Sequence, residues 1–173
     1  EIKDVGHSGG IFDEKKLMWM NHEYLKKKSL DELFSMAEPY LKTFDLKGKS
    51  NDWLKQVLEA IWTSINYLSE IPKLVRVFFE RSDISADNLN MLKADLSKKV
   101  LSALKEVLQK NEIIKENFKE LMNEVAKKSG AKGKDLYMPI RIALTGESHG
   151  PELILVLPIL GSKECISRIG KLF

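Results

Sequence analysis

Ser148 is the first side chain whose setting could do chemistry, because it stands between two glycines in the stretch GESHG, residues 146–150. That spacing matches the G-x-S-x-G nucleophile motif, in which a sharp turn after a strand presents the hydroxyl to a substrate. Here the stretch follows a segment with helical periodicity, and His149, the last histidine of the chain, adjoins the serine. The acid and base order that a catalytic triad needs is missing, so the pattern argues against a hydrolase.

The other reactive residue types do not form a metal or nucleophile pattern either. The histidines at positions 7, 22 and 149 lack the spacing that zinc sites use. Cys165, the single cysteine, lies in an apolar-periodic stretch, so packing is its expected role. A lone cysteine excludes an intramolecular disulfide and fits a reducing cytoplasm. Glycine-rich phosphate-binding motifs are absent from the sequence. We therefore expect no catalytic residue, cofactor site or metal site in this chain.

Arg141 suggests a different chemistry, the recognition of RNA. Its guanidinium can donate two parallel hydrogen bonds to a base edge, and the small residues at 145–151 would let a base approach the backbone. Pro151 at a helix start would leave N–H groups available as donors, and KKSGAKGK at 127–134 supplies cations for phosphates. On these residues alone, a solvent-facing arginine beside an ordinary interhelix loop remains the favoured interpretation.

Helices must position these side chains, because apolar residues recur at intervals of three and four along most of the chain. Asp13 is expected to cap the first helix, and Ser29 with Glu32 forms a capping signal for the second. The expected helical segments are 13–28, 29–44 with a kink or break near Pro39, 53–68, 72–79, 88–111, 112–129, 137–145, 150–161 and 162–173.

The segment at 137–146 is ambiguous, because its apolar composition also suits a buried strand. Pro139 at a helix start and Gly146 just after a helix end favour a helix. The polar stretch at 80–90 predicts a hinge, so the expected fold is all-α, with two consecutive small helical subdomains.

Composition sets the class of protein. The chain has 173 residues, 43% hydrophobic and 31% charged, which is ordinary for a globular protein. Its net charge of +3 does not by itself establish nucleic-acid binding. No apolar run reaches the roughly 18–20 residues of a membrane span, and the first residues do not form a signal peptide. Because the chain does not begin with Met, we expect a portion of a longer, cytoplasmic protein that does not bind membranes.

Three stretches resemble the C-terminal region of bacterial glutamyl-tRNA synthetases. FDEKKLMWMNHEYL at 12–25 resembles the segment after their catalytic domain, and YLSEIPKLVRVFF at 67–79 resembles the middle of their anticodon-binding region. GKDLYMPIRIALTGESHGPELILVLPILGSKECISRI at 133–169 resembles their long C-terminal signature. The likeness runs in order from about residue 12 to the end of the chain.

The resemblance implies a class I aminoacyl-tRNA synthetase, which uses ATP and Mg²⁺ to activate glutamate and then esterifies it to tRNA-Glu. The HIGH-type and KMSKS-type signatures that bind ATP in that class are absent here. The resemblance therefore implies a catalytically inert portion of a monomeric parent enzyme. Residues 1–23 would be a linker and stem-side segment, and residues 24–82 and 83–173 would be two anticodon-binding helical subdomains.

The resemblance also assigns RNA contacts to individual positions. Four positions match the element that contacts anticodon bases in related enzymes: Arg141, Gly150, Pro151 and Leu153. Four others match positions near the RNA backbone or stem, although packing is the expected role of the tryptophan: Lys132, Lys134, Trp19 and Asn21.

Ser64 departs from the family pattern. Eight residues before the proline that matches Pro72, discriminating enzymes commonly carry an arginine that checks the third anticodon base, and relaxed enzymes often carry a glutamine. Serine has neither the reach nor the charge of arginine. The hypothesis is that the third base is read weakly and that the parent enzyme also charges tRNA-Gln.

A helical protein-interaction module without RNA binding is the alternative function. Such a module would use helix faces like those that carry Trp53 and Trp62 for docking. The clustering of lysines at 127–134 favours RNA binding over this alternative.

Overall fold

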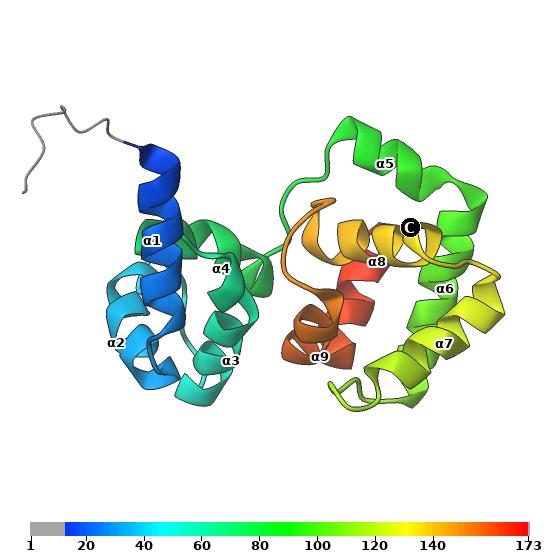
Figure 1. The fold of residues 1–173 in the computed structure, drawn as a ribbon. Coiled ribbons are helices and arrows are strands. Elements are labelled where there is room, and N and C mark those ends of the chain that lie inside the picture. Colours follow the sequence, from blue (N-terminus) through cyan, green and yellow to red (C-terminus); the bar gives the residue numbers. More distant parts are fainter. Residues whose placement is uncertain (1–12, 173) are drawn as a thin grey trace, which may run out of the picture.

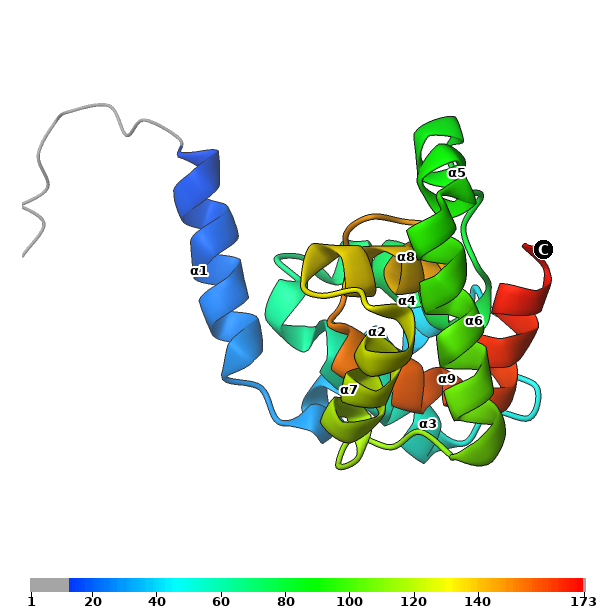
Figure 2. The same cartoon turned by 90° about the vertical axis from the view of Figure 1, so that its right-hand side faces the viewer.

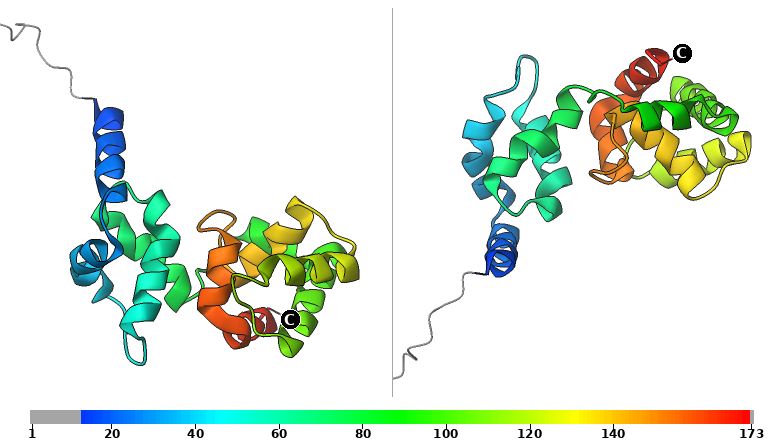
Figure 3. Two further views of the ribbon diagram at one scale, coloured as in Figure 1. Left: turned by 60° about the horizontal axis from the view of Figure 1, so that its bottom comes forward. Right: turned by 90° about the horizontal axis from the view of Figure 1, so that it is seen from above.

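The computed structural model describes residues 13–172, and within that range the chain forms nine α-helices and no strand. The all-α expectation is confirmed, and the helices gather in two groups that lie side by side (Figures 1 and 3). The first group contains α1 (Glu14–Lys26), α2 (Leu30–Leu41), α3 (Asn51–Ile61) and α4 (Ile71–Phe79), with 3₁₀ turns η2 (Trp62–Ser64) and η3 (Leu68–Glu70). The second contains α5 (Ala86–Lys93), α6 (Asp95–Lys110), α7 (Phe118–Ser129), α8 (Lys134–Thr145) and α9 (Leu153–Gly170).

Helix ends follow local capping chemistry. The Asp13 carboxylate accepts a hydrogen bond from the Lys16 N–H at 3.1 Å, as expected for a cap. At α2, the Glu32 N–H donates to the Ser29 hydroxyl and the Ser29 N–H donates to Glu32, which confirms the capping box. The hydrogen bond from the Ser29 N–H, together with Lys28, lowers the pKa of Glu32 to about 2. This ionised carboxylate also suits the positive end of the helix dipole.

The prediction of one long helix over 53–68 is wrong. α3 ends at Ile61, the turn η2 follows, and Ile65 adopts an extended backbone conformation. The N–H groups of Asn66 and Tyr67 donate to the Glu70 carboxylate at 2.7 and 3.2 Å, so a side chain replaces the helical partners. The apolar period continues past the helix because Ile65 is still fully buried.

The remaining helices in the first group depart less from expectation. α2 passes through Pro39 and ends two residues later, so the expected break is the helix terminus itself. Pro72 lies in the first turn of α4, as expected. α1 projects away from the other helices (Figures 2 and 3), and it runs across the expected boundary at residues 23 and 24.

The second group corrects three sequence expectations. The helix expected over 88–111 is divided into α5 and α6 at Ala94, whose backbone is extended. Residues 112–117 are not part of α7. α8 begins at Lys134, so Pro139 lies inside the helix rather than at its start, on a buried face. Gly161 interrupts α9 with a positive φ of 76°, which agrees with the two separate segments expected there.

One connected set of buried apolar side chains extends through both helix groups. α9 packs against α3 and α4, and the Trp53 indole N–H donates to the Ile159 carbonyl across the two groups at 3.0 Å. The stretch expected to be a hinge has two parts, a connection at 80–85 and the helix α5. The connection is fixed to α8, because the Ser82 N–H donates to the Thr145 carbonyl at 3.1 Å. None of the described helices is both long and apolar enough to span a membrane.

Candidate nucleic-acid interface

Arg141 lies on α8, one turn before the helix ends. Its side chain is half-buried, and one guanidinium nitrogen, Nη1, donates to the Pro151 carbonyl at 2.6 Å. Burial lowers the pKa of Arg141 from its ordinary value, and the nearby Glu152 carboxylate opposes that shift. Among the described residues, Pro151 is the one hydrogen-bond partner of the guanidinium. Its other N–H groups therefore remain available for an external acceptor.

The loop after α8 is held in one shape by polar contacts. The Thr145 hydroxyl donates to the Arg141 carbonyl at 2.8 Å and accepts from the Glu147 N–H at 3.1 Å. The Asn88 amide of α5 donates to the Gly146 carbonyl at 3.3 Å. Gly146 has a φ of 85°, and a Cβ there would overlap the Ser82 carbonyl, so only glycine fits this helix end.

The loop ends where α9 begins, at Leu153, with Glu152 as its N-cap. Pro151, expected at the helix start, lies two residues before it and is buried. Glu152 makes no side-chain capping bond, so the N–H groups of Leu153 and Ile154 have no intrahelical partner. The Leu153 side chain is itself buried in the core, which leaves its backbone N–H as the group that can face a ligand.

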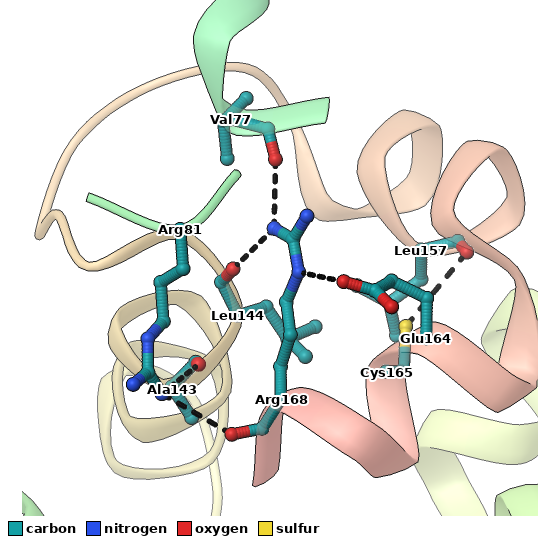
Figure 4. Close-up of polar contacts among 8 residues, drawn as sticks. All are labelled: Val77, Arg81, Ala143, Leu144, Leu157, Glu164, Cys165 and Arg168. Carbon is teal, nitrogen blue, oxygen red and sulfur yellow. Dashed lines mark hydrogen bonds and ion pairs between the residues drawn. The ribbon is translucent and has the colours of Figure 1, made fainter. Parts of the chain in front are cut away.

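Two arginines, Arg81 and Arg168, fix the C-terminal end of α8, where the loop starts (Figure 4). Arg168 is 3% exposed, and its guanidinium donates to the Val77 carbonyl of α4 at 2.7 Å and to the Leu144 carbonyl of α8 at 2.8 Å. These carbonyls lie in the last turns of their helices, where intrahelical donors run out and the helix dipole is negative. Glu164 adds an ion pair with the Arg168 Nε atom at 2.7 Å.

Arg81 extends this arrangement to α9. It donates to the Ala143 carbonyl at 3.4 Å and to the Arg168 carbonyl at 3.1 Å, and burial followed by the proximity of Arg168 lowers its pKa. The four final carbonyls of α8 all have donors: Ile142 from Gly146, Ala143 from Arg81, Leu144 from Arg168 and Thr145 from Ser82. Neither arginine could be found from the sequence, since partners 62 and 91 positions away leave no local pattern.

The two basic residues expected to face phosphates, Lys132 and Lys134, are exposed at the start of α8. α8 has 12 residues, so its start and its end are about 18 Å apart. The lysines are therefore separated from the loop, not adjacent to it. Lys134 and Arg141 are seven positions apart and lie on the same helix face, which could follow one strand of a nucleic acid.

Gly150, the remaining site residue of the loop, is exposed and has a φ of 141°. The other three site residues, Ser64, Asn21 and Trp19, lie in the first helix group. Ser64 is exposed at the end of η2, and Asn21 lines a pocket of about 360 Å³ together with Asn66 and Tyr67. His22 of α1 donates to the Ile65 carbonyl at 2.9 Å, which places α1 beside the turn that carries Ser64. Trp19 is 62% exposed, so the packing expected for it is not found within residues 13–172.

The residues that suggested reaction chemistry lie in settings without it. The Ser148 hydroxyl and the His149 Nδ1 atom share a 2.8 Å hydrogen bond in a loop that follows a helix rather than a strand. Cys165 is buried, and desolvation raises the pKa of its thiol to about 12, which agrees with a packing role. The described residues contain no cluster of three potential metal ligands.

The sequence matches a known protein family and known tRNA ligases. The family model for the anticodon binding domain matches residues 32–173. Glutamate–tRNA ligase 2 of Caldanaerobacter subterraneus subsp. tengcongensis is 36% identical over 98% of the chain, and glutamate–tRNA ligase 1 of Caldicellulosiruptor saccharolyticus is 37% identical over 97%. The chain spans 36% of the length of each of these relatives.

A solved structure shares the fold. The glutamate tRNA ligase from Elizabethkingia meningosepticum, crystallised with its amino acid, superposes with a TM-score of 0.86 at 21% identity. The superposition covers 99% of this chain and 34% of that one. The shared fold and the match of the family model to most of the sequence lead to one conclusion: the chain belongs to the anticodon-binding domain family and is homologous to that part of the glutamate–tRNA ligases.

Proposed function

We propose that this chain is the tRNA anticodon-binding portion of a glutamate–tRNA ligase. The parent enzyme attaches glutamate to tRNA-Glu in an ATP-dependent two-step reaction for protein synthesis. The observation that carries the proposal concerns Arg141, the loop at 146–152 and the first turn of α9, which we call the Arg141 element. One guanidinium nitrogen of Arg141 is held by Pro151 while the other donors stay open. A held but unsaturated arginine beside uncapped helix N–H groups suits the recognition of a base edge and its phosphate.

Each site residue has a role in this proposal. Arg141 donates to an anticodon base, and the backbone at Gly150, Pro151 and Leu153 contacts the bases beside it. Ser64 lies at the third base and reads it weakly, so the parent enzyme also accepts tRNA-Gln. Four residues at the start of α8 and on α1, exposed except for the half-buried Asn21, contact the RNA backbone and stem: Lys132, Lys134, Trp19 and Asn21.

Catalysis and tRNA binding belong to different parts of the parent enzyme in this proposal. ATP and Mg²⁺ supply glutamate activation at the HIGH-type and KMSKS-type signatures, which this sequence does not contain. This chain binds and orients the tRNA, with residues 24–82 and 83–173 as its two reading subdomains and residues 1–23 as the connection to the catalytic part. The parent enzyme is a cytoplasmic monomer in this proposal.

Direct binding of this chain to tRNA-Glu tests the proposal. We expect binding at low salt that weakens steeply as salt rises, because neutralised phosphates release counterions. Replacing one anticodon base in the same tRNA should weaken binding by about 1–3 kcal/mol, whereas the unchanged stem keeps the non-specific part. Equal affinity for the altered tRNA would contradict anticodon reading. Undetectable binding at low salt would favour the protein-interaction module.

A further inference from the structure

A cleft of about 730 Å³ lies in the first helix group, and none of the residues assigned to RNA contacts lines it. Its walls are the loop between α2 and α3 and one side of α4, along the length of that helix up to its C-cap Glu80. The residues that matter to the argument are four cations, Lys47, Lys49, Lys73 and Arg76, and two aromatic residues, Phe44 and Phe79. We call it the lysine cleft. Its volume falls in the range of about 300–1,000 Å³ that is usual for small-molecule sites.

The charge of the lysine cleft is only partly compensated. Of its two carboxylates, Glu80 forms an ion pair with Arg76 at 2.5 Å, and Asp45 accepts a backbone hydrogen bond from the Lys47 N–H at 3.0 Å. Lys47, Lys49 and Lys73 have no carboxylate partner among the described residues, and the Lys49 ammonium lies 4.1 Å from the centre of the Trp53 ring. The cleft therefore presents an excess of positive charge to solvent.

A hollow on α7 shows that this excess is not a general property of the surface. That hollow, of about 570 Å³, is lined by Lys119 and Lys127 together with three glutamates, so its acids outnumber its bases. A multivalent anion would be repelled there and attracted to the lysine cleft. The two lysines on α7 are therefore suitable positions for a control with the same change in charge.

The lysine cleft also has an aromatic wall. Phe44 and Phe79 are stacked with ring centroids 4.5 Å apart, and Phe79 meets the Trp53 ring edge-on at 5.3 Å. Both phenylalanines are half-buried, and Trp53 is anchored through its N–H to the Ile159 carbonyl. Cations beside a fixed aromatic surface are the combination that holds a base by stacking and its phosphate by charge.

We propose that the lysine cleft binds a nucleotide unit, with the base against Phe44 and Phe79 and the phosphate between Lys47 and Lys73. The cleft borders the start of α3, whereas Ser64 follows the end of that helix, which has 11 residues and is about 16 Å long. The site is therefore distinct from the anticodon-reading residues. A free nucleotide and a nucleotide within an RNA chain carry the same two groups, and the experiment separates these sources.

The first arm of the test uses AMP and ATP as probes of the whole chain. Binding is followed by the shift of the Trp53 indole N–H resonance in heteronuclear NMR. We expect saturable shifts in the native chain and roughly fivefold weaker binding in the variant K47Q/K73Q, which removes two phosphate-directed charges. The control K119Q/K127Q carries the same change in charge on α7 and should bind like the native chain. If an acidic peptide of glutamates shifts the Trp53 resonance and AMP does not, the proposal is contradicted.

The second arm uses tRNA-Glu. If the nucleotide belongs to RNA, K47Q/K73Q should lower the salt dependence of tRNA binding by about 1.4 in slope, and the α7 control should lower it less. A change with AMP and ATP alone identifies the free nucleotide, and a change with tRNA alone identifies the RNA chain. If neither probe distinguishes K47Q/K73Q from the control, the site is wrong. Failure of the native chain to bind tRNA would refute the proposed function, while the AMP arm would still decide this site.

Discussion

The Arg141 element and the Ser64 turn occupy different helix groups and are built in opposite ways. Arg141 is half-buried, bonded to Pro151 and supported by a helix end whose four final carbonyls all have donors. Ser64 is exposed at the end of a 3₁₀ turn, and no hydrogen bond of its side chain is found among the described residues. One position is held in place before any ligand arrives, and the other is open.

This difference indicates which helix group can discriminate between bases. A preorganised donor loses little entropy when it meets its acceptor, so it can discriminate between bases. A short exposed side chain offers one hydroxyl and no fixed geometry. The comparison therefore predicts strong reading by the second helix group and weak reading by the first, and the following substitutions test it.

The largest effect is expected from Arg168→Met, which removes the support beneath the Arg141 element. Two carbonyls at helix ends would lose their donor in a buried setting, so the free energy of unfolding should fall by about 3–5 kcal/mol. Urea denaturation measures this quantity. Glu164→Gln keeps the carbonyl bonds and an acceptor oxygen for Arg168, and it removes only the charge of a half-exposed carboxylate, so it should cost less than about 1 kcal/mol. Equal losses in the two variants would show that the carbonyl bonds contribute little.

A smaller effect, on recognition rather than folding, is expected from Arg141→Ala. Loss of the base-directed donors should weaken tRNA-Glu binding by about 1–3 kcal/mol. Arg141→Lys keeps the charge and removes the planar fork, so it should recover only the salt-dependent part of the affinity. Titrations at two salt concentrations measure both parts. Full recovery by lysine would mean that Arg141 contacts a phosphate, which would remove one side of the comparison.

The smallest effect is expected from Ser64→Arg, which gives position 64 the same side chain as Arg141. Added reach and charge should increase the preference for tRNA-Glu over tRNA-Gln by about 1 kcal/mol, because an exposed arginine is less well fixed than Arg141. Competition binding with the two tRNAs gives this ratio. If the native chain already prefers tRNA-Glu strongly, Ser64 is not the weak point and the third base is read elsewhere.

Features set by neighbouring residues could be predicted from the sequence. The caps at Asp13 and Ser29 and the glycine stop at Gly146 follow from contacts within four residues, and the structure confirms them. The helical nature of 137–146 could be inferred in the same way, and the long signature around it pointed to the family that the comparisons show.

Features set by distant residues could not be predicted. Ile65 keeps the spacing of four from Ile61 and is buried like it, although the backbone leaves the helix between them, so the periodicity did not reveal the helix end. Pro139 suggested a helix start, but proline is tolerated inside α8. The arginine pair depends on carbonyls brought together only by the tertiary fold, so neither its members nor the support that it gives to Arg141 could be found by pattern.

The hydrogen bond between Arg168 and the Val77 carbonyl has a consequence for folding during synthesis. Val77 of α4 is synthesised 91 residues before Arg168, which donates to its carbonyl. During translation the first helix group therefore emerges with this carbonyl and the Trp53 indole still bonded to water, since the Ile159 carbonyl also comes late. Although N-terminal parts generally fold first as they leave the ribosome, the first group lacks these two partners on α9, so we expect it to stay loosely ordered until α9 is released. The docking of α9 thus completes the hydrogen bonds of both groups at once.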